Sequence, residues 1–145
     1  MIKFFTTEPF RKSIDNYLKK NEYKNCKKDL CSFFLNKTIE TIFSQPILIA
    51  PNKNFNFIKS RLENSSFNKG KSGGYRLYYY ADSSIDHVYL IGFYPKTGKH
   101  GRDDLTDTEL KILIRYFSTE KQKGLLREHD ITREFEIIEM RQDRV

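Results

Sequence analysis

A glycine-rich segment that carries two lysines leads directly into a strand with an arginine near its start. The segment reads Lys-Gly-Lys-Ser-Gly-Gly-Tyr-Arg over residues 69–76, and its cations are Lys69, Lys71 and Arg76. Glycines let a backbone take positive φ values and approach another backbone closely. Cations beside such a backbone can hold a polyanion through its phosphate groups. The types and spacing of these residues therefore predict a phosphate-binding loop.

A second basic segment, residues 94–102, follows the next predicted strand. Its charged or titratable side chains are Tyr94, Lys96, Lys99, His100 and Arg102. If the strands at 75–81 and 88–94 pair, this segment comes close to the first one. We therefore expect both segments to contribute to one cationic site.

The Gly70-Lys71-Ser72 sequence matches the end of a nucleotide-binding P-loop. The full pattern requires a glycine five positions before Gly70, where this chain has Ser65. The loop also leads into a predicted strand, whereas a P-loop leads into a helix. The sequence therefore predicts no nucleotide cofactor.

The chain as a whole is basic. Its 145 residues include 26 Lys and Arg against 19 Asp and Glu, which gives a formal net charge of +7 and a pI of about 9.3. This balance favours nucleic acid or another acidic partner. A solvated basic surface would give the same totals, so the clustering of cations on loops beside strands is what favours a binding site. The length suits one domain with a hydrophobic core.

Cys26 and Cys31 are five positions apart in a segment with helical periodicity, so they point away from each other and no disulfide is expected. Two cysteines and three scattered histidines make no zinc pattern, and we expect no metal and no cofactor. No stretch approaches the roughly 20 apolar residues that span a membrane. The first residues lack the apolar region of a secretory signal. The sequence predicts a cytoplasmic protein with no membrane partner.

The spacing of apolar residues predicts an α+β fold with a mainly antiparallel sheet. The expected elements are a strand at 2–6, a helix that begins after Thr6 or Thr7, a helix from about 23 to about 43, strands at 55–62, 75–81 and 88–94, and a helix that begins at the capping box 106–109. Pro46 and Pro51 are expected to bound an irregular connection. Along 75–81, alternation places Tyr78 and Tyr80 on the face of Arg76.

Residues 1–119 are expected to form the main domain. Residues 120–145 read as a charged extension that packs on this domain or trails from it. Ile131, Phe135 and Ile138 fit one face of a last helix, and the segment from 135 to 138 fits a strand equally well.

These blocks resemble the RelE/HigB-type toxins of bacterial toxin–antitoxin modules, members of the RelE/ParE superfamily. The resemblance covers residues 4–117 and rests on the 69–76 segment, the tyrosine-rich strand, the apolar strand, the Tyr-Pro-Lys sequence and the Asp-Leu-Thr-Asp-Thr-Glu sequence. The loop at 97–102 is longer than in the family, and the extension has no counterpart there. The resemblance implies an N-terminal strand and a two-helix hairpin packed on a curved, mainly antiparallel sheet, followed by a C-terminal helix.

The same resemblance implies a ribosome-dependent mRNA endonuclease that a cognate antitoxin neutralises. The reaction is a metal-independent transesterification, in which the 2′-hydroxyl of RNA attacks the adjacent phosphate and the 5′-oxygen leaves. Such a site needs a proton acceptor, cations for the extra negative charge and a proton donor.

Arg76 matches the strand arginine that contacts the scissile phosphate in the family, and Lys96 matches the lysine after the last strand. With Lys71 they form the expected catalytic group, in which like-charge repulsion lowers the pKa of a lysine. For each of the three, the alternative is a solvated surface side chain. The residues expected to bind RNA are Lys69, Lys99, Arg102 and Tyr78.

His100 and Tyr94 are the candidate acid–base groups. The reference pKa of histidine suits this work, but His100 lies in the loop that the family does not share. We expect it to be a flexible loop residue without a catalytic role.

A second interpretation is a non-catalytic relative that acts by binding, either a ParE-like inhibitor of DNA gyrase or a plain interaction domain. The group formed by Arg76, Lys71 and Lys96 favours RNA cleavage. The lack of a clear histidine or carboxylate base keeps the binding interpretation open.

Overall fold

The computed structural model describes residues 1–35, 37–66 and 70–138. The first half contains β1 (Lys3–Thr6), α1 (Glu8–Leu18), the 3-10 helix η1 (Asn21–Tyr23), α2 (Cys26–Leu35), α3 (Ile39–Phe43), β2 (Ile47–Asn52) and β3 (Phe55–Leu62). The second half contains β4 (Tyr75–Asp82), β5 (His87–Pro95), α4 (Asp107–Lys123), β6 (Arg127–Asp130) and β7 (Glu136–Ile137). The predicted α+β class is confirmed.

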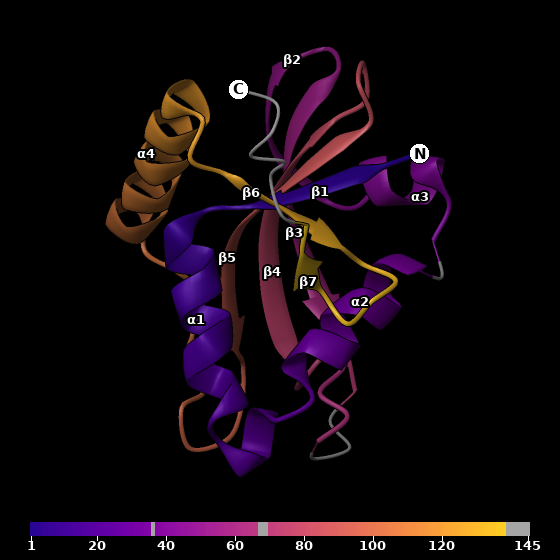
Figure 1. Ribbon diagram of the computed structural model, residues 1–145. Coiled ribbons are helices and arrows are strands. Elements are labelled where there is room, and N and C mark those ends of the chain that lie inside the picture. The colour runs from indigo at the N-terminus through magenta and orange to yellow at the C-terminus, as the bar shows by residue number, and fades with distance from the viewer. Residues whose placement is uncertain (36, 67–69, 139–145) are drawn as a thin grey trace.

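The seven strands of the described chain form one sheet in the order β2-β3-β4-β5-β1-β6-β7 (Figure 1). β1 runs parallel to β5, and every other neighbouring pair is antiparallel. The parallel pair arises because the N-terminal helices carry the chain from β1 to the opposite edge of the sheet, where the hairpin-linked strands begin. The predicted mainly antiparallel sheet is therefore confirmed.

Helices cover both faces of the sheet. The N-terminal helices bury Phe10, Leu30 and Phe34 against the face of β4 that carries Leu77 and Tyr79. On the other face, Phe117 of α4 packs with the aromatic residues Phe57, Tyr80 and Tyr89. Strands buried on both faces have near-continuous apolar sequences, and β4 and β5 fit this description.

The start of α1 depends on a residue near the end of α4. Thr7 caps the helix as predicted, with its hydroxyl accepting a hydrogen bond from the Phe10 amide. The Glu8 amide donates to both carboxylate oxygens of Glu120, at 2.9 and 3.1 Å. Glu120 is buried. Its carboxylate lies at the N-terminus of α1, where the helix dipole is positive and favours an anion.

Two elements differ from the prediction. The single helix expected from about 23 to about 43 is divided, because Thr38 caps a new helix by accepting a hydrogen bond from the Thr41 amide. The connection between Pro46 and Pro51 contains β2, which lies at the edge of the sheet and is exposed along its whole length. Proline lacks an amide hydrogen, and an edge strand tolerates this loss.

The C-terminal part joins the same sheet. α4 continues past residue 119 to Lys123, and Gly124 ends it with a left-handed φ of 70°. β6 then pairs with β1, and β7 pairs with β6. The segment that fitted either a helix or a strand thus contains the short strand β7, while residues 139–145 lie outside the described residues.

Cys26 and Cys31 are buried free thiols. Burial raises the pKa of the Cys26 thiol to about 12 and that of Cys31 to about 11. Among the described residues, no helix has both the length and the apolar character needed to cross a membrane.

A buried histidine holds the C-terminal strands against β1. His129 Nε2 lies 2.7 Å from the Thr6 hydroxyl, and Nδ1 lies 2.9 Å from the Phe135 carbonyl. A carbonyl only accepts, so Nδ1 carries the proton and Nε2 accepts from Thr6. Burial lowers the pKa of His129 to about 4, and the nearby charge of Arg11 acts in the same direction.

This burial predicts a loss of stability in acid. An unfolded histidine titrates near 6.5, whereas the folded ring titrates near 4. The contribution is therefore fully present above about pH 6.5, and falls as the pH drops from 6.5 to 4. The total loss is about 3 kcal/mol. Urea unfolding of the parent and of His129→Gln at pH 7 and pH 4 should show the extra loss in the parent only. Equal losses in both proteins would contradict the assignment.

Candidate functional site

The two basic segments lie side by side, as expected from the pairing of their strands. β4 and β5 pair with Arg76 opposite Tyr94. The Lys96 amide donates to the Gly74 carbonyl at 2.7 Å, and the Thr97 hydroxyl donates to the Gly73 carbonyl at 2.5 Å. We call residues 70–74 the glycine loop and residues 96–106 the β5–α4 loop. These two hydrogen bonds join the two loops.

Close packing explains the need for glycine at one position of the glycine loop. A side chain on Gly74 would collide with the Leu62 carbonyl and would lie 2.9 Å from the Asn64 amide nitrogen. The predicted close backbone approach is thus present at Gly74. Positive φ values among the described glycines are found elsewhere, at Gly98 and Gly124.

Arg76 is buried and binds the glycine loop. Its Nη1 donates to the carbonyls of Lys71 and Tyr75 at 3.1 and 3.2 Å, and its Nη2 donates to the Ser72 carbonyl at 2.9 Å. Only 5% of the residue is exposed. Burial lowers the pKa of Arg76, and the nearby charge of Arg61 lowers it further. This guanidinium therefore holds the loop in place.

Two cations of β3 lie next to Arg76 on the same face of the sheet. Arg61 is directly opposite Arg76, and Lys59 is directly opposite Tyr78. Arg61 is exposed, and the Lys59 ammonium lies 5.7 Å from the centre of the Tyr78 ring. We call Lys59, Arg61 and Arg76 the basic face. Alternation along 55–62 and pairing with the next strand would have identified Lys59 and Arg61 from sequence.

Asp104 connects the basic face to the β5–α4 loop. Its Oδ1 accepts a hydrogen bond from the Lys59 ammonium at 2.6 Å and another from the Tyr94 hydroxyl at 3.1 Å. The hydrogen bond from Lys59 lowers the pKa of Asp104, so this carboxylate is ionised at neutral pH. Burial and the neighbouring Tyr78 raise the pKa of Tyr94, which stays protonated. No local pattern in the sequence pointed to Asp104, because its partner Lys59 is 45 positions away.

The other two cations near the basic face have carboxylate partners. The Lys96 ammonium lies 3.7 Å from Asp103. Arg102 makes a bidentate contact with Glu109, at 2.6 and 2.8 Å, and its guanidinium lies 5.5 Å from the centre of the Tyr94 ring. This contact lowers the pKa of Glu109 to about 2. Arg102 thereby ties the loop to the capping box at the start of α4.

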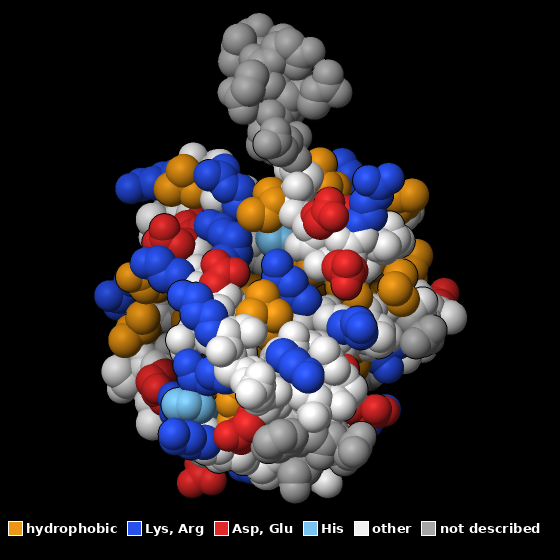
Figure 2. All heavy atoms as spheres, turned by 60° about the horizontal axis from the view of Figure 1, so that its bottom comes forward, with side chains coloured by type: hydrophobic (Ala, Val, Ile, Leu, Met, Phe, Trp, Pro, Cys, Tyr) orange, Lys and Arg blue, Asp and Glu red, His pale blue; other side chains and the backbone are white. Residues whose placement is uncertain are grey.

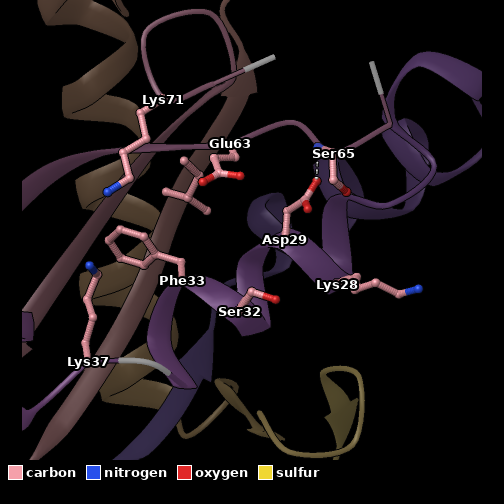
Figure 3. A pocket seen from close by; sticks show the side chains of 9 residues that line it. Lys28, Asp29, Ser32, Phe33, Lys37, Glu63, Ser65 and Lys71 are labelled. Carbon is pink, nitrogen blue, oxygen red and sulfur yellow. Dashed lines mark hydrogen bonds between the residues drawn. The ribbon is translucent and has the colours of Figure 1, made fainter. Parts of the chain in front are cut away.

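Lys71 does not join Arg76 and Lys96. Its carbonyl binds Arg76, but its side chain lines a pocket with Phe33 and Lys37 on the α2 side of the molecule (Figure 3). The predicted catalytic group is therefore not assembled as expected. The structure instead brings Arg76 together with Lys59, Arg61, Tyr94 and Asp104.

Lys99 and His100 pack against η1, and their backbone amides donate hydrogen bonds to it. The Lys99 amide donates to the Glu22 carboxylate at 2.9 Å, and the His100 amide donates to the Tyr23 hydroxyl at 3.0 Å. Gly98 has a φ of 92°, and a Cβ there would lie 2.7 Å from the same hydroxyl. The flexible loop expected around His100 is in fact anchored.

Tyr78 has no ring face available for a nucleotide base. It is 1% exposed and lies between the rings of Phe57 and Tyr94, with centroids 6.0 and 6.2 Å away. The stacking role expected of Tyr78 therefore does not fit this arrangement. Lys69, the remaining predicted RNA contact, lies outside the described residues.

Figure 2 brings forward the end of the molecule where the glycine loop and the β5–α4 loop lie. Basic side chains are spread across this view, with acidic side chains among them. Of the described residues, no group of three or more His, Cys, Asp and Glu side chains could hold a metal ion.

Comparison with models of protein families finds no match to this chain. Comparison with curated proteins also finds no match.

Replacing Arg76 tests its role as the anchor of the glycine loop. Arg76→Ala should lower the free energy of unfolding by about 2 kcal/mol, because hydrogen bonds from a charged group contribute roughly 1.5–3 kcal/mol. Hydrogen exchange of the loop amides should also become faster. The matched control is Arg61→Ala, an exposed arginine on the neighbouring strand, for which urea unfolding should change by less than about 0.5 kcal/mol. Equal stability and exchange in the two variants would contradict this role.

Proposed function

We propose that this protein cleaves RNA, as a toxin of the RelE/HigB type. The observation that carries the proposal is the basic face, where Lys59, Arg61 and Arg76 lie in register beside an ionised carboxylate and a protonated tyrosine. Crowded cations on neighbouring strands suit a phosphodiester backbone, because they neutralise its charge. They also suit a reaction in which negative charge grows on phosphorus-bound oxygens.

Asp104 and Tyr94 supply the proton chemistry in this proposal. The Asp104 carboxylate accepts the proton of the RNA 2′-hydroxyl, and the 2′-oxygen forms a bond to the adjacent phosphorus. The bond from phosphorus to the 5′-oxygen breaks, and that oxygen takes a proton from the Lys59 ammonium. The products are a 2′,3′-cyclic phosphate and a 5′-hydroxyl. Tyr94 orients the carboxylate through the hydrogen bond to Oδ1, and Arg61 binds the phosphate.

The biological partners in the proposal come from the sequence resemblance. The segment at 69–76 and the block at 94–109 support mRNA on the ribosome as the substrate, and a cognate antitoxin as the inhibitor. Both partners place the protein in the cytoplasm. An exposed cationic face also needs control by a partner, because it binds RNA with little sequence preference.

A second candidate function is binding without cleavage. It is favoured by the engagement of the cations with the protein itself. The Arg76 guanidinium binds three carbonyl groups, and Lys59, Lys96 and Arg102 each have a carboxylate partner. In this alternative the face binds a protein or nucleic acid partner, as in a ParE-like toxin, and no bond is broken.

Lys59 and Arg61 provide the direct test of cleavage. Arg76 holds the glycine loop, so its replacement would also disturb the structure. The double variant Lys59→Ala, Arg61→Ala should cut RNA about 100- to 1,000-fold more slowly, since one transition-state charge contact contributes about that much. Primer extension on mRNA from cells that briefly express each protein measures the cuts. The control is Lys53→Ala, which removes an exposed lysine from the turn between β2 and β3. Parental cutting by the double variant would refute the proposal.

Asp104→Asn separates the two functions. If Asp104 is the base, cleavage falls by about 100-fold or more, while RNA binding is kept or strengthened because a negative charge is lost. If the face only binds, the parent does not cut RNA and the variant simply binds more tightly. Purified ribosomes with a short mRNA provide the assay. Parental cleavage by Asp104→Asn would show that another group is the base.

A further inference from the structure

A pocket of about 460 Å³ lies between α2 and the segment that follows β3. Its lining residues are Lys28, Asp29, Ser32, Phe33, Lys37, Leu62, Glu63, Ser65 and Lys71 (Figure 3). The pocket lies on the α2 side, whereas the side chains of the basic face lie on the α4 side. Its volume falls within the range of about 300–1,000 Å³ that is usual for small-molecule sites.

One end of the pocket is cationic. The ammonium groups of Lys37 and Lys71 both point toward the Phe33 ring (Figure 3), and the Lys37 ammonium lies 4.5 Å from the ring centre. Among the described residues, no carboxylate lies within ion-pair distance of either lysine. Burial lowers the pKa of Lys37, and the charge of Lys71 lowers it further. An anion between the two lysines would relieve this repulsion.

The other end of the pocket carries carboxylates. Asp29 accepts a hydrogen bond from the Ser65 amide at 3.0 Å. Burial raises the pKa of Asp29, and the charge of Glu63 beside it acts in the same direction. Carboxylates accept hydrogen bonds from hydroxyl and amino groups but repel anions. The pocket therefore suits a ligand that is negative at one end and carries donors at the other. A nucleotide has this asymmetry, because its phosphate is negative and its sugar hydroxyls and base amino groups are donors.

We infer that this pocket binds one nucleotide of a single-stranded RNA. Its phosphate lies between Lys37 and Lys71, and its sugar hydroxyls or base amino groups face Glu63 and Asp29. The inference rests on the proposed function for the identity of the ligand, and adds a second RNA contact to the basic face. Arg76 links the two sites, because it holds the carbonyl of Lys71 while its side chain lies on the basic face. Lys71 is then a binding residue.

The pocket itself is tested without RNA. Adenosine monophosphate, inorganic phosphate and adenosine are each titrated into isotope-labelled protein, and amide signals are followed by NMR. The monophosphate should shift the signals of residues 29–37, 63–65 and 71, phosphate should shift them less, and adenosine should leave them unchanged. The shifts should be lost in Lys37→Ala, Lys71→Ala. An absence of local shifts, or equal shifts in the variant, overturns the inference. A glutamate-rich peptide that shifts these signals where the monophosphate does not also overturns it.

RNA binding provides the second test. Fluorescence anisotropy with a short single-stranded RNA is measured over a series of salt concentrations. The Lys37→Ala, Lys71→Ala variant should bind more weakly than Lys53→Ala, which loses an exposed lysine of the turn between β2 and β3. The slope of log K against log salt should fall by about 0.7 per phosphate lost. Equal affinity and slope in the two variants overturn the inference.

The failures of the two proposals are distinguishable. A parent that binds RNA through the pocket but never cuts it leaves this inference standing and refutes the proposed function. A parent that cuts RNA but shows no binding in the pocket supports the proposed function and overturns this inference. A parent that binds no RNA overturns the RNA assignment of the pocket, even if the monophosphate shifts its signals.

Discussion

The burial of β4 and β5 on both faces is the constraint on which the rest of this structure depends. Their side chains point alternately toward the N-terminal helices and toward α4. Each large apolar side chain that is removed from water contributes about 1.5–3 kcal/mol, so neither face can be left uncovered. This explains why helices precede and follow the strands. It also places Arg76 of the basic face at the start of a buried strand, opposite the exposed Arg61.

The charged groups at that end are organised by the same burial. Arg76 is itself buried, with only 5% of the residue exposed, so its guanidinium does not extend freely into water. A buried charge is costly unless it is well paired, and the carbonyls of the glycine loop provide that pairing. The exposed charge contacts are left to β3 and the β5–α4 loop. A residue can thus match a motif and still serve mainly as a support for its neighbours.

The elements that sequence analysis predicted well are those with strong local signals. The tyrosine-rich strand and the apolar strand have unbroken β patterns, and the caps at Thr7 and Thr106 are local hydrogen bonds. β2 was missed because an exposed edge strand with a proline has no hydrophobic alternation. The break in the second helix depends on a single threonine cap, which competes with a continuing helical pattern.

The candidate site was only partly predictable for a different reason. Pairing of the two strands placed the basic segments together, as the alternation implied. The direction of the Lys71 side chain, however, depends on how the glycine loop turns around Arg76. The contact between Lys59 and Asp104 joins residues 45 positions apart and requires the folded loop. Neither is encoded in local spacing.

The position of β1 has a consequence for the order in which the chain folds during synthesis. β1 lies between β5 and β6, the start of α1 is held by Glu120, and Thr6 binds His129. The strand partners of β1 therefore become available only after the chain has been synthesised as far as β5 and β6. Contacts so distant in sequence form slowly, because the loop entropy must be overcome first. β1 thus stays without its neighbouring strands until β5 and β6 have been synthesised, and the sheet is completed late in folding.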